Sequence, residues 1–292
     1  MLGRLFTVGL SVVCLSLLPS PAQAGTEREQ LLDQALQISQ AQRTMEVIGA
    51  ALDRNIQASP QFSQLEERVR DRIAEVFRRA FAPQKYVQSV RTLLSERMTD
   101  EALRSYVTAM QTPISLKALQ FELASALATP EQIQEYAKLA SKESEYGDRL
   151  VLLKRLDESS GGSEMMLAIT MHSILSSAEM IRRIEALRGS PLPPRGQPGG
   201  TRRAPVSKAE FTELANSIRP RVRRESLETM LFVYQSLTKA ELNQYTELAE
   251  LAPMRSAALA MNDALGALFF AAQKEAFDNL MLEMQGQGER SI

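Results

Sequence analysis

The chain has very few of the residues that bind metals or act as nucleophiles. Its 292 residues include one cysteine, one histidine and no tryptophan. The cysteine, Cys14, lies in the apolar N-terminal segment, so a chain that loses this segment has no thiol, disulfide or thiolate metal site. One histidine is too few for a histidine-based zinc site. We therefore expect neither a metal nor a cofactor.

Aromatic residues and excess charge are also scarce. Aromatic residues make up 5% of the chain and the net charge is −1. Stacking platforms for bases therefore have little material, and a nucleic-acid binder would be strongly basic, so we expect no nucleic-acid partner. No sustained alternation of apolar and polar residues predicts a sheet. The apolar fraction of 44% and charged fraction of 24% are typical of globular proteins.

Residues 1–24 have the features of a secretory signal peptide. Arg4 precedes an apolar run, and Ala22 and Ala24 favour cleavage after Ala24. The run is too short to span a membrane, so we expect no transmembrane segment in the mature chain. Cys14 lies within the run and follows two valines rather than small residues, so we favour cleavage without lipid attachment. A cysteine-free exported chain fits the bacterial periplasm.

The remaining sequence predicts only helices. Good helix formers dominate, and apolar residues recur at helical spacing between turn signals. We predict an all-α protein of two similar multi-helix halves, residues 25–147 and 148–285, that form an array of helical hairpins without a β-sheet. A disordered tail follows at 286–292. We expect one long helix over Thr26–Ile56 and another over Arg219–Gln235.

One pattern recurs at three predicted helix starts. A threonine is followed by Leu or Ile four positions on and by Tyr three positions later. The threonine hydroxyl can cap the helix, and Gln132 and Glu241 complete capping boxes in the second and third copies. The tyrosines fall on the apolar face, where we favour packing over recognition. The motif residues, with the prolines that begin the next helices, are Thr99, Tyr106, Pro113, Thr129, Tyr136, Thr238, Tyr245 and Pro253.

When the sequence is aligned with itself so that Thr99 matches Thr238, the predicted flanking helices also match, and Pro113 falls within one residue of Pro253. This correspondence predicts a near-duplication of one helical unit. Residues 188–206, with five prolines, four glycines and four arginines, would be a mobile loop inserted into the second half.

The segment Met110-Gln-Thr-Pro-Ile-Ser-Leu-Lys117 resembles the signature of the domain of unknown function 2059 family, secreted helical proteins of proteobacteria. Thr112, Pro113 and Lys117 match the signature, whereas Ala109-Met110 replaces its aromatic pair and Ser115 its glycine. The resemblance is best over residues 84–127. It implies a helical fold and an exported location, and it brings no activity with it.

Candidate catalytic groups are few. His172 lies in an apolar helix whose neighbours offer no nucleophile or carboxylate, so we interpret it as a packed side chain. The acid pairs Glu143 with Glu145 and Asp157 with Glu158 are interpreted as solvated charges. Methionines, including Met281 and Met284, are interpreted as core filler rather than copper ligands or an adaptable binding surface. No phosphate loop, dinucleotide fingerprint or nucleophile elbow is present in the sequence.

Basic residues gather from Arg182 to Arg224, within the predicted loop and on both sides of it, whereas residues 225–292 are acidic overall. One hypothesis is a patch for an anionic envelope component. The interpretation we favour is that these arginines are solvated and pair with the acidic last helices. The arginines are Arg188, Arg195, Arg202, Arg203, Arg219, Arg221, Arg223 and Arg224, and the last four are expected to crowd a helix start.

Together these features predict an exported helical protein with a non-enzymatic binding or structural role in the bacterial cell envelope. Its partner would be an anionic envelope component or another periplasmic protein. A carboxylate-dependent hydrolase of an envelope polymer is one alternative, and it requires two acids facing a cleft. A holdase-like periplasmic chaperone is another, and it requires an exposed apolar groove.

Overall fold

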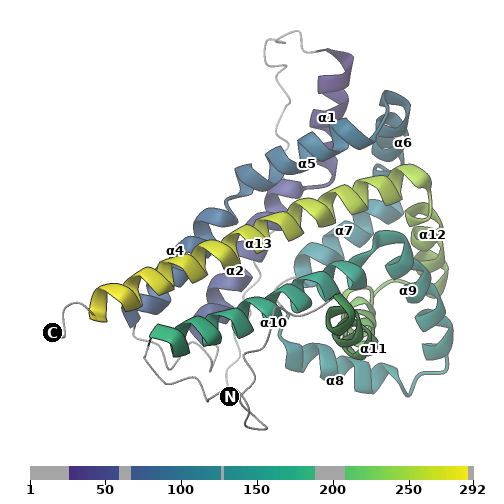
Figure 1. Cartoon of the computed structure of the whole chain (residues 1–292). Coiled ribbons are helices and arrows are strands. Elements are labelled where there is room, and N and C mark those ends of the chain that lie inside the picture. The colour runs from purple at the N-terminus through teal and green to yellow at the C-terminus, as the bar shows by residue number, and fades with distance from the viewer. Residues whose placement is uncertain (1–25, 59–66, 126–127, 188–207, 289–292) are drawn as a thin grey trace, which may run out of the picture.

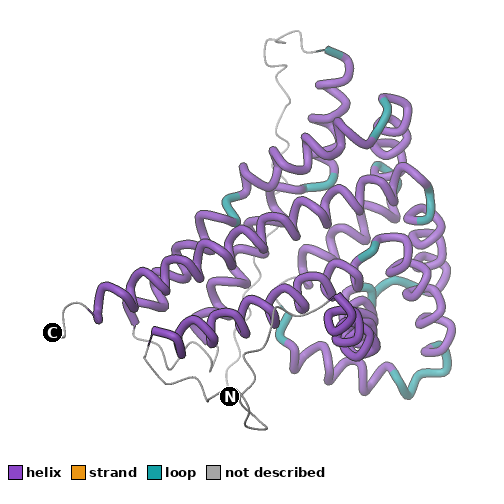
Figure 2. Tube along the Cα trace, viewed as in Figure 1, coloured by secondary structure: helices purple, strands orange, loops and turns teal. Residues whose placement is uncertain are grey.

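The computed structural model describes residues 26–58, 67–125, 128–187 and 208–288. Within these ranges every regular element is a helix and no strand occurs, which confirms the all-α prediction (Figures 1 and 2). The helices are α1 (Glu27–Ile38), α2 (Ala41–Ala58), α4 (Glu67–Ala80), α5 (Pro83–Arg97), α6 (Asp100–Met110), α7 (Pro113–Ser125), α8 (Pro130–Ala140), α9 (Tyr146–Ser160), α10 (Gly162–Leu187), α11 (Lys208–Val233), α12 (Lys239–Ala249) and α13 (Ala252–Gly288). The predicted signal peptide with Cys14 and the loop at 188–206 lie outside the described residues.

The expected single helix at the N-terminus is wrong, because the chain breaks between α1 and α2. Gln40 has a φ of 49° and is left-handed, although no glycine or proline marks the position. Ser39 closes α1, and its hydroxyl donates to the Leu36 carbonyl at 3.0 Å. The bend lets α1 pack on α5 and α6 while α2 packs on α4 and α5. Tertiary packing therefore overrides the continuous helical pattern.

The opposite error occurs at α11. A helix beginning at Arg219 was expected, but α11 runs from Lys208 and passes through Pro220. Proline removes one backbone hydrogen bond and usually kinks or ends a helix. Here Ala215 and Val222, on the two sides of the proline, are buried in one small cluster, so packing holds both segments. The last helix, α13, reaches Gly288 and includes the first three residues of the predicted tail.

The three predicted caps are confirmed. The hydroxyls of Thr99, Thr129 and Thr238 accept the backbone N–H of the residue three positions on, at 3.2 to 3.3 Å. The side chains of Gln132 and Glu241 accept the backbone N–H of Thr129 and Thr238, which completes the capping boxes. These caps begin α6, α8 and α12, and Pro113 begins α7, as expected.

Two arginines show that the halves correspond in space. Arg28 of α1 donates to the carbonyls of Ser95 and Met98, where α5 ends. Arg149 of α9 donates to the carbonyls of Tyr234 and Leu237, at 2.9 and 2.8 Å, where α11 ends. Relative to the capping threonines Thr99 and Thr238, these are the same two carbonyls in each half.

The correspondence extends along α1 and α9. The spacing that separates Arg28 from Arg149 also separates the buried Leu32 from Leu153. It separates Gln40 from Gly161 as well, and these are the described residues with positive φ. Thus α1 and α2 correspond to α9 and α10. In each pair, the joint between the two helices contains one left-handed residue, Gln40 or Gly161.

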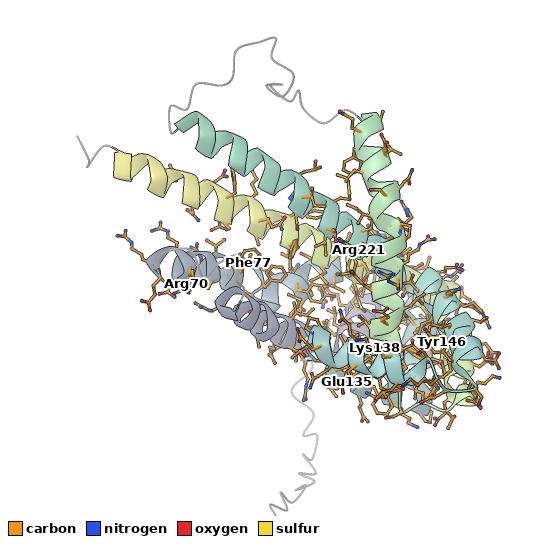
Figure 3. The ribbon with its side chains drawn as sticks, turned by 90° about the horizontal axis from the view of Figure 1, so that it is seen from below. Arg70, Phe77, Glu135, Lys138, Tyr146 and Arg221 are labelled. Atoms are coloured by element: carbon orange, nitrogen blue, oxygen red, sulfur yellow. The ribbon has the colours of Figure 1, made fainter. Side chains whose placement is uncertain are left out.

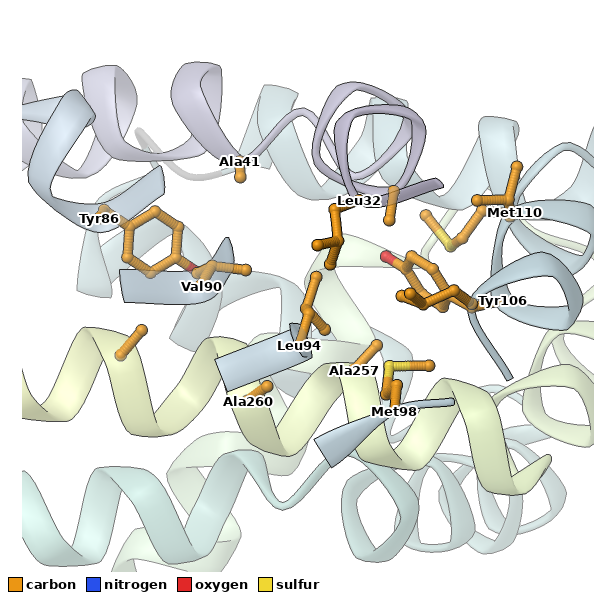
Figure 4. Packing of buried hydrophobic residues seen from close by; sticks show 14 of the residues in the cluster. Leu32, Ala41, Tyr86, Val90, Leu94, Met98, Tyr106, Met110, Ala257 and Ala260 are labelled. Atoms are coloured by element: carbon orange, nitrogen blue, oxygen red, sulfur yellow. The ribbon is translucent and has the colours of Figure 1, made fainter. Parts of the chain in front are cut away.

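The corresponding helices α7 and α13 each contribute to the core of the other half and also keep contacts in their own half. The first buried cluster joins α1, α2, α4, α5 and α6, and it includes Leu119 of α7 together with Met254, Ala257 and Ala260 of α13. Figure 4 shows Ala257 and Ala260 in this cluster. The second joins α9, α11 and α12 but includes Ile114 and Ala118 of α7. In Figure 1, α13 lies along α5 and crosses the molecule between the halves. The predicted division at 147/148 therefore does not separate two independent cores.

Removing the hydroxyl of a capping threonine should destabilise the protein. We expect Thr238→Ala to lower the free energy of unfolding by about 0.5–2 kcal/mol, because the first turn of α12 loses an acceptor. Thr99→Ala should have a similar effect. Thr108 is exposed within α6 and bonds back to Arg104, so Thr108→Ala is a near-neutral control. Urea unfolding measures these differences, and an equal loss in the control would contradict this role.

The two arginine contacts should differ in strength. We expect Arg149→Met to cost about 1–3 kcal/mol of unfolding free energy, because it leaves the Leu237 carbonyl without its donor in a buried site. The Tyr234 carbonyl loses one of two donors and keeps the Leu237 N–H at 3.0 Å. Arg149 is 7% exposed, whereas the Arg28 side chain is 33% exposed, so Arg28→Met should cost less. The control is Arg91→Met, which removes an ion pair to the exposed Asp33 and should cost less than about 1 kcal/mol.

Candidate functional site

A hollow of about 380 Å³ lies at the bend between α1 and α2. Its rim carries three carboxamides and one charge of each sign, and two apolar side chains complete the lining. The lining residues are Leu36, Gln37, Gln40, Gln42, Arg43, Glu46 and Val87. Val87 belongs to α5, and the others belong to α1, α2 and their joint. The left-handed Gln40 is one of these lining residues, and local backbone strain is a feature of many binding sites.

The charged groups of this hollow are available for a ligand. Gln42 donates to Glu46 at 3.1 Å and leaves the second carboxylate oxygen of Glu46 open. Arg43 pairs with no carboxylate in the described part of the chain, and both Arg43 and Glu46 are exposed. The sequence carries no local signal for these residues, because its apolar pattern predicts one continuous helix there.

The equivalent joint of the second half is closed by internal hydrogen bonds. At the positions of Leu36 and Gln42 it has Asp157 and Ser163. Asp157 accepts bonds from the Ser163 backbone N–H at 2.9 Å and from its hydroxyl at 2.6 Å. Ser226, which corresponds to Val87, donates to the same carboxylate at 3.2 Å. Asp157 is 7% exposed, so its interpretation as a solvated charge is wrong, whereas Glu158 is exposed as expected.

Two further contacts complete this closure. Asn262 of α13 donates to the Ser160 carbonyl at 2.7 Å. Leu259 of α13 lies so close to Gly161 that a Cβ there would be 3.1 Å from its methyl group. The first half therefore keeps a hollow at a joint that α13 covers in the second half.

The arginines of α11 lie in mid-helix, so their expected place at a helix start is wrong. Arg219 and Arg223 donate to Glu164 of α10, and the hydrogen bond from Arg219 lowers the pKa of that carboxyl. Arg221 and Arg224 face carboxylates one turn on, Glu225 at 3.6 Å and Glu228 at 4.0 Å. Figure 3 labels Arg221 on α11, which packs on α10.

These ion pairs support the interpretation that the α11 arginines are neutralised within the protein, rather than the hypothesis of an open anion-binding patch on α11. Glu225 and Glu228 lie in the acidic segment 225–292, as expected, but on α11 itself, whereas Glu164 belongs to α10. The other four arginines of the predicted patch, Arg188, Arg195, Arg202 and Arg203, lie outside the described residues, so their role stays a prediction.

The motif tyrosines have packing roles, which is the interpretation we favour over a role in recognition. Tyr106 is 3% exposed in the first cluster, and Tyr136 meets the Phe232 ring edge-on with centroids 5.9 Å apart. Tyr245 and Tyr234 both donate to one oxygen of Glu122, at 2.9 and 2.6 Å. Burial raises the pKa of both phenols, and the nearby carboxylate adds to this effect.

Glu122 belongs to α7 and is partly buried, so this triad joins α7 to α11 and α12. The sequence reading missed Glu122 and Arg149. The arginine had a usable signal: an acid–arginine pair followed by Leu-Leu occurs at both Glu27-Arg28 and Asp148-Arg149.

The residues of the family resemblance also lie at this connection. Thr112 ends the α6–α7 turn, and its hydroxyl lies 2.9 Å from that of the buried Ser115. Lys117 donates to Glu241 of α12 at 2.7 Å and lowers the pKa of that carboxyl to about 2. Thr112 thus organises the α6–α7 turn, and Lys117 joins α7 to α12 of the second half.

The remaining candidates take structural positions. His172 is partly buried beside the Phe270 ring, with centroids 4.3 Å apart. Glu143 and Glu145 are exposed. The described ranges contain no group of three or more histidine, cysteine or acidic residues arranged to hold a metal ion. No helix within them has the length and apolarity needed to cross a membrane.

Comparison with known proteins adds no relative. No protein-family model, curated protein or solved structure matches this chain. The resemblance to the domain of unknown function 2059 family therefore stays a prediction from the residues that carry it.

Buried tyrosines should make stability fall at high pH. Burial raises the pKa of Tyr86 to about 12, whereas an unfolded tyrosine has a pKa of about 10. The unfolded chain therefore loses this proton at a lower pH than the folded chain. The contribution of Tyr86 to the free energy of unfolding is complete below a pH of about 10, and it is lost as the pH rises to about 12. Tyr86→Phe should reduce the pH-dependent loss by up to about 3 kcal/mol. Urea unfolding between these pH values measures the slope, and an unchanged slope would contradict the assignment.

Proposed function

We propose that this protein is an exported, non-enzymatic binding protein of the bacterial cell envelope and that the α1–α2 hollow is its ligand site. The observation that carries the proposal is the contrast between two equivalent joints. The joint at Gly161 is closed by Asp157, Ser163, Ser226 and α13, whereas the joint at Gln40 is open.

The lining of the hollow favours binding. Ligand sites commonly combine apolar walls with a few polar groups that orient the ligand, in volumes of about 300–1,000 Å³. Here Leu36 and Val87 are the apolar part, and the carboxamides with Arg43 and Glu46 are the orienting part. Carboxamides donate and accept hydrogen bonds, so they suit a polar ligand that carries both kinds of group.

The envelope location rests on the signal peptide predicted at residues 1–24. At the joint between α9 and α10, Glu164 is paired with Arg219 and Arg223. Of the two joints, the one between α1 and α2 therefore keeps open polar groups within the described residues.

The proposal is tested by crosslinking in intact cells. A photoreactive residue replaces Gln42 at the rim of the hollow, Arg221 on α11, or Glu158 on the exposed side of α9 as a control. We expect capture at Gln42 that Arg43→Gln abolishes while the protein stays folded, because Arg43 pairs with no carboxylate among the described residues. Mass spectrometry identifies what is captured and the N-terminus of the exported chain.

Two outcomes would contradict the proposal in different ways. Capture at Arg221 with none at Gln42 would move the binding site to the arginines of α11. A chain retained in the cytoplasm with its first 24 residues intact would overturn the envelope location.

A further inference from the structure

We infer that the α1–α2 hollow binds a zwitterion, namely an amino acid or short peptide with a free carboxylate and a free amine. This inference rests on the proposed function, because it names the ligand class of the same site. It depends on how the charges of the two equivalent joints differ.

The first step is the cation. Arg43 corresponds to Glu164, and in the second half the Glu164 carboxylate is neutralised by Arg219 and Arg223. The first half has the opposite sign at this position and no matching counter-ion. Ala80 and Gln84, the residues that correspond to Arg219 and Arg223, carry no charge. A carboxylate from outside would therefore complete the pair, and the guanidinium fork suits a carboxylate.

The second step is the anion. Glu46 lies three positions after Arg43, on the same side of α2, but no ion pair joins the two side chains. Glu46 accepts one bond from Gln42 at 3.1 Å, which fixes the carboxylate and leaves acceptor capacity for a donor. The hollow thus presents a separated positive and negative group, which is the arrangement that a zwitterion complements.

The third step is what lies between the charges. Gln37 and Gln40 add carboxamides that can pair with a peptide amide group, and Leu36 with Val87 can contact an apolar side chain. The volume of about 380 Å³ is near the lower end of ligand sites. A polymer of uniform charge would leave either Arg43 or Glu46 facing a group of its own sign.

The test is calorimetry on the purified chain with four probes. These are the dipeptide leucyl-alanine, its N-acetylated form, its C-amidated form and the neutral disaccharide sucrose. We expect the free dipeptide to bind, and blocking either end to weaken binding by about fivefold or more, which is about 1 kcal/mol for each lost charge contact.

Two variants assign the charges. Arg43→Gln should remove the preference for the free carboxylate over the amide. Glu46→Gln should remove the preference for the free amine over the acetyl form. Lys154→Gln and Glu158→Gln, exposed changes on α9, should leave both preferences unchanged.

The results that overturn the inference separate it from the proposed function. Equal binding of the free and blocked dipeptides, or binding of sucrose alone, would exclude a zwitterion site but leave a binding protein. Absence of dipeptide binding together with capture at Gln42 in cells would do the same. Absence of both would overturn the inference and the proposed function.

Discussion

The carbonyl groups at the ends of α5 and α11 need donors, and the rest of the fold depends on how they are satisfied. The last turn of a helix has carbonyls without intrahelical partners and carries the negative end of the helix dipole. Arg28 and Arg149 supply donors from α1 and α9, so one side chain in each half joins a helix end to a second helix. Thr99 caps α6 directly after the end of α5, and Thr238 caps α12 after the short turn at 234–237, which leaves little freedom at either corner.

This corner determines where the next helices go. Because α6 and α12 are fixed at their starts, α7 and α13 leave in defined directions. Each contributes residues to the core of the opposite half, and α13 also packs on α10 of its own half. This sharing makes the two cores interdependent. It also explains the position of the partly buried Glu122, whose carboxylate accepts hydrogen bonds from Tyr234 and Tyr245. A polar group of this kind needs partners, and the crossing of α7 brings them together.

The sequence predicted what local chemistry determines. Helix caps, prolines at helix starts and the all-α class follow from residue types within a few positions, and these predictions are confirmed. The errors occur where distant packing decides. Gln40 breaks a helix that local pattern would continue, Pro220 fails to break one, and Asp157 is buried by serines from two other segments. The Gln40 break had a signal in the internal repeat, since its counterpart is Gly161, which the sequence marks as a turn.

The internal repeat also allows the hollow to be compared with the equivalent joint of the second half. After a duplication, each half can change its joint independently, as long as the arginine contact is kept. In the second half the joint has Asp157, Ser163 and Ser226, which satisfy one another, and α13 covers it. The first half has Leu36, Gln42 and Val87 at those positions, which do not form such a network, and Arg43 has no carboxylate partner in the described ranges. A set of polar groups beside apolar walls, left open in one half and closed in the other, is better explained by an external partner than by stability, because stability alone would favour the closed form in both halves.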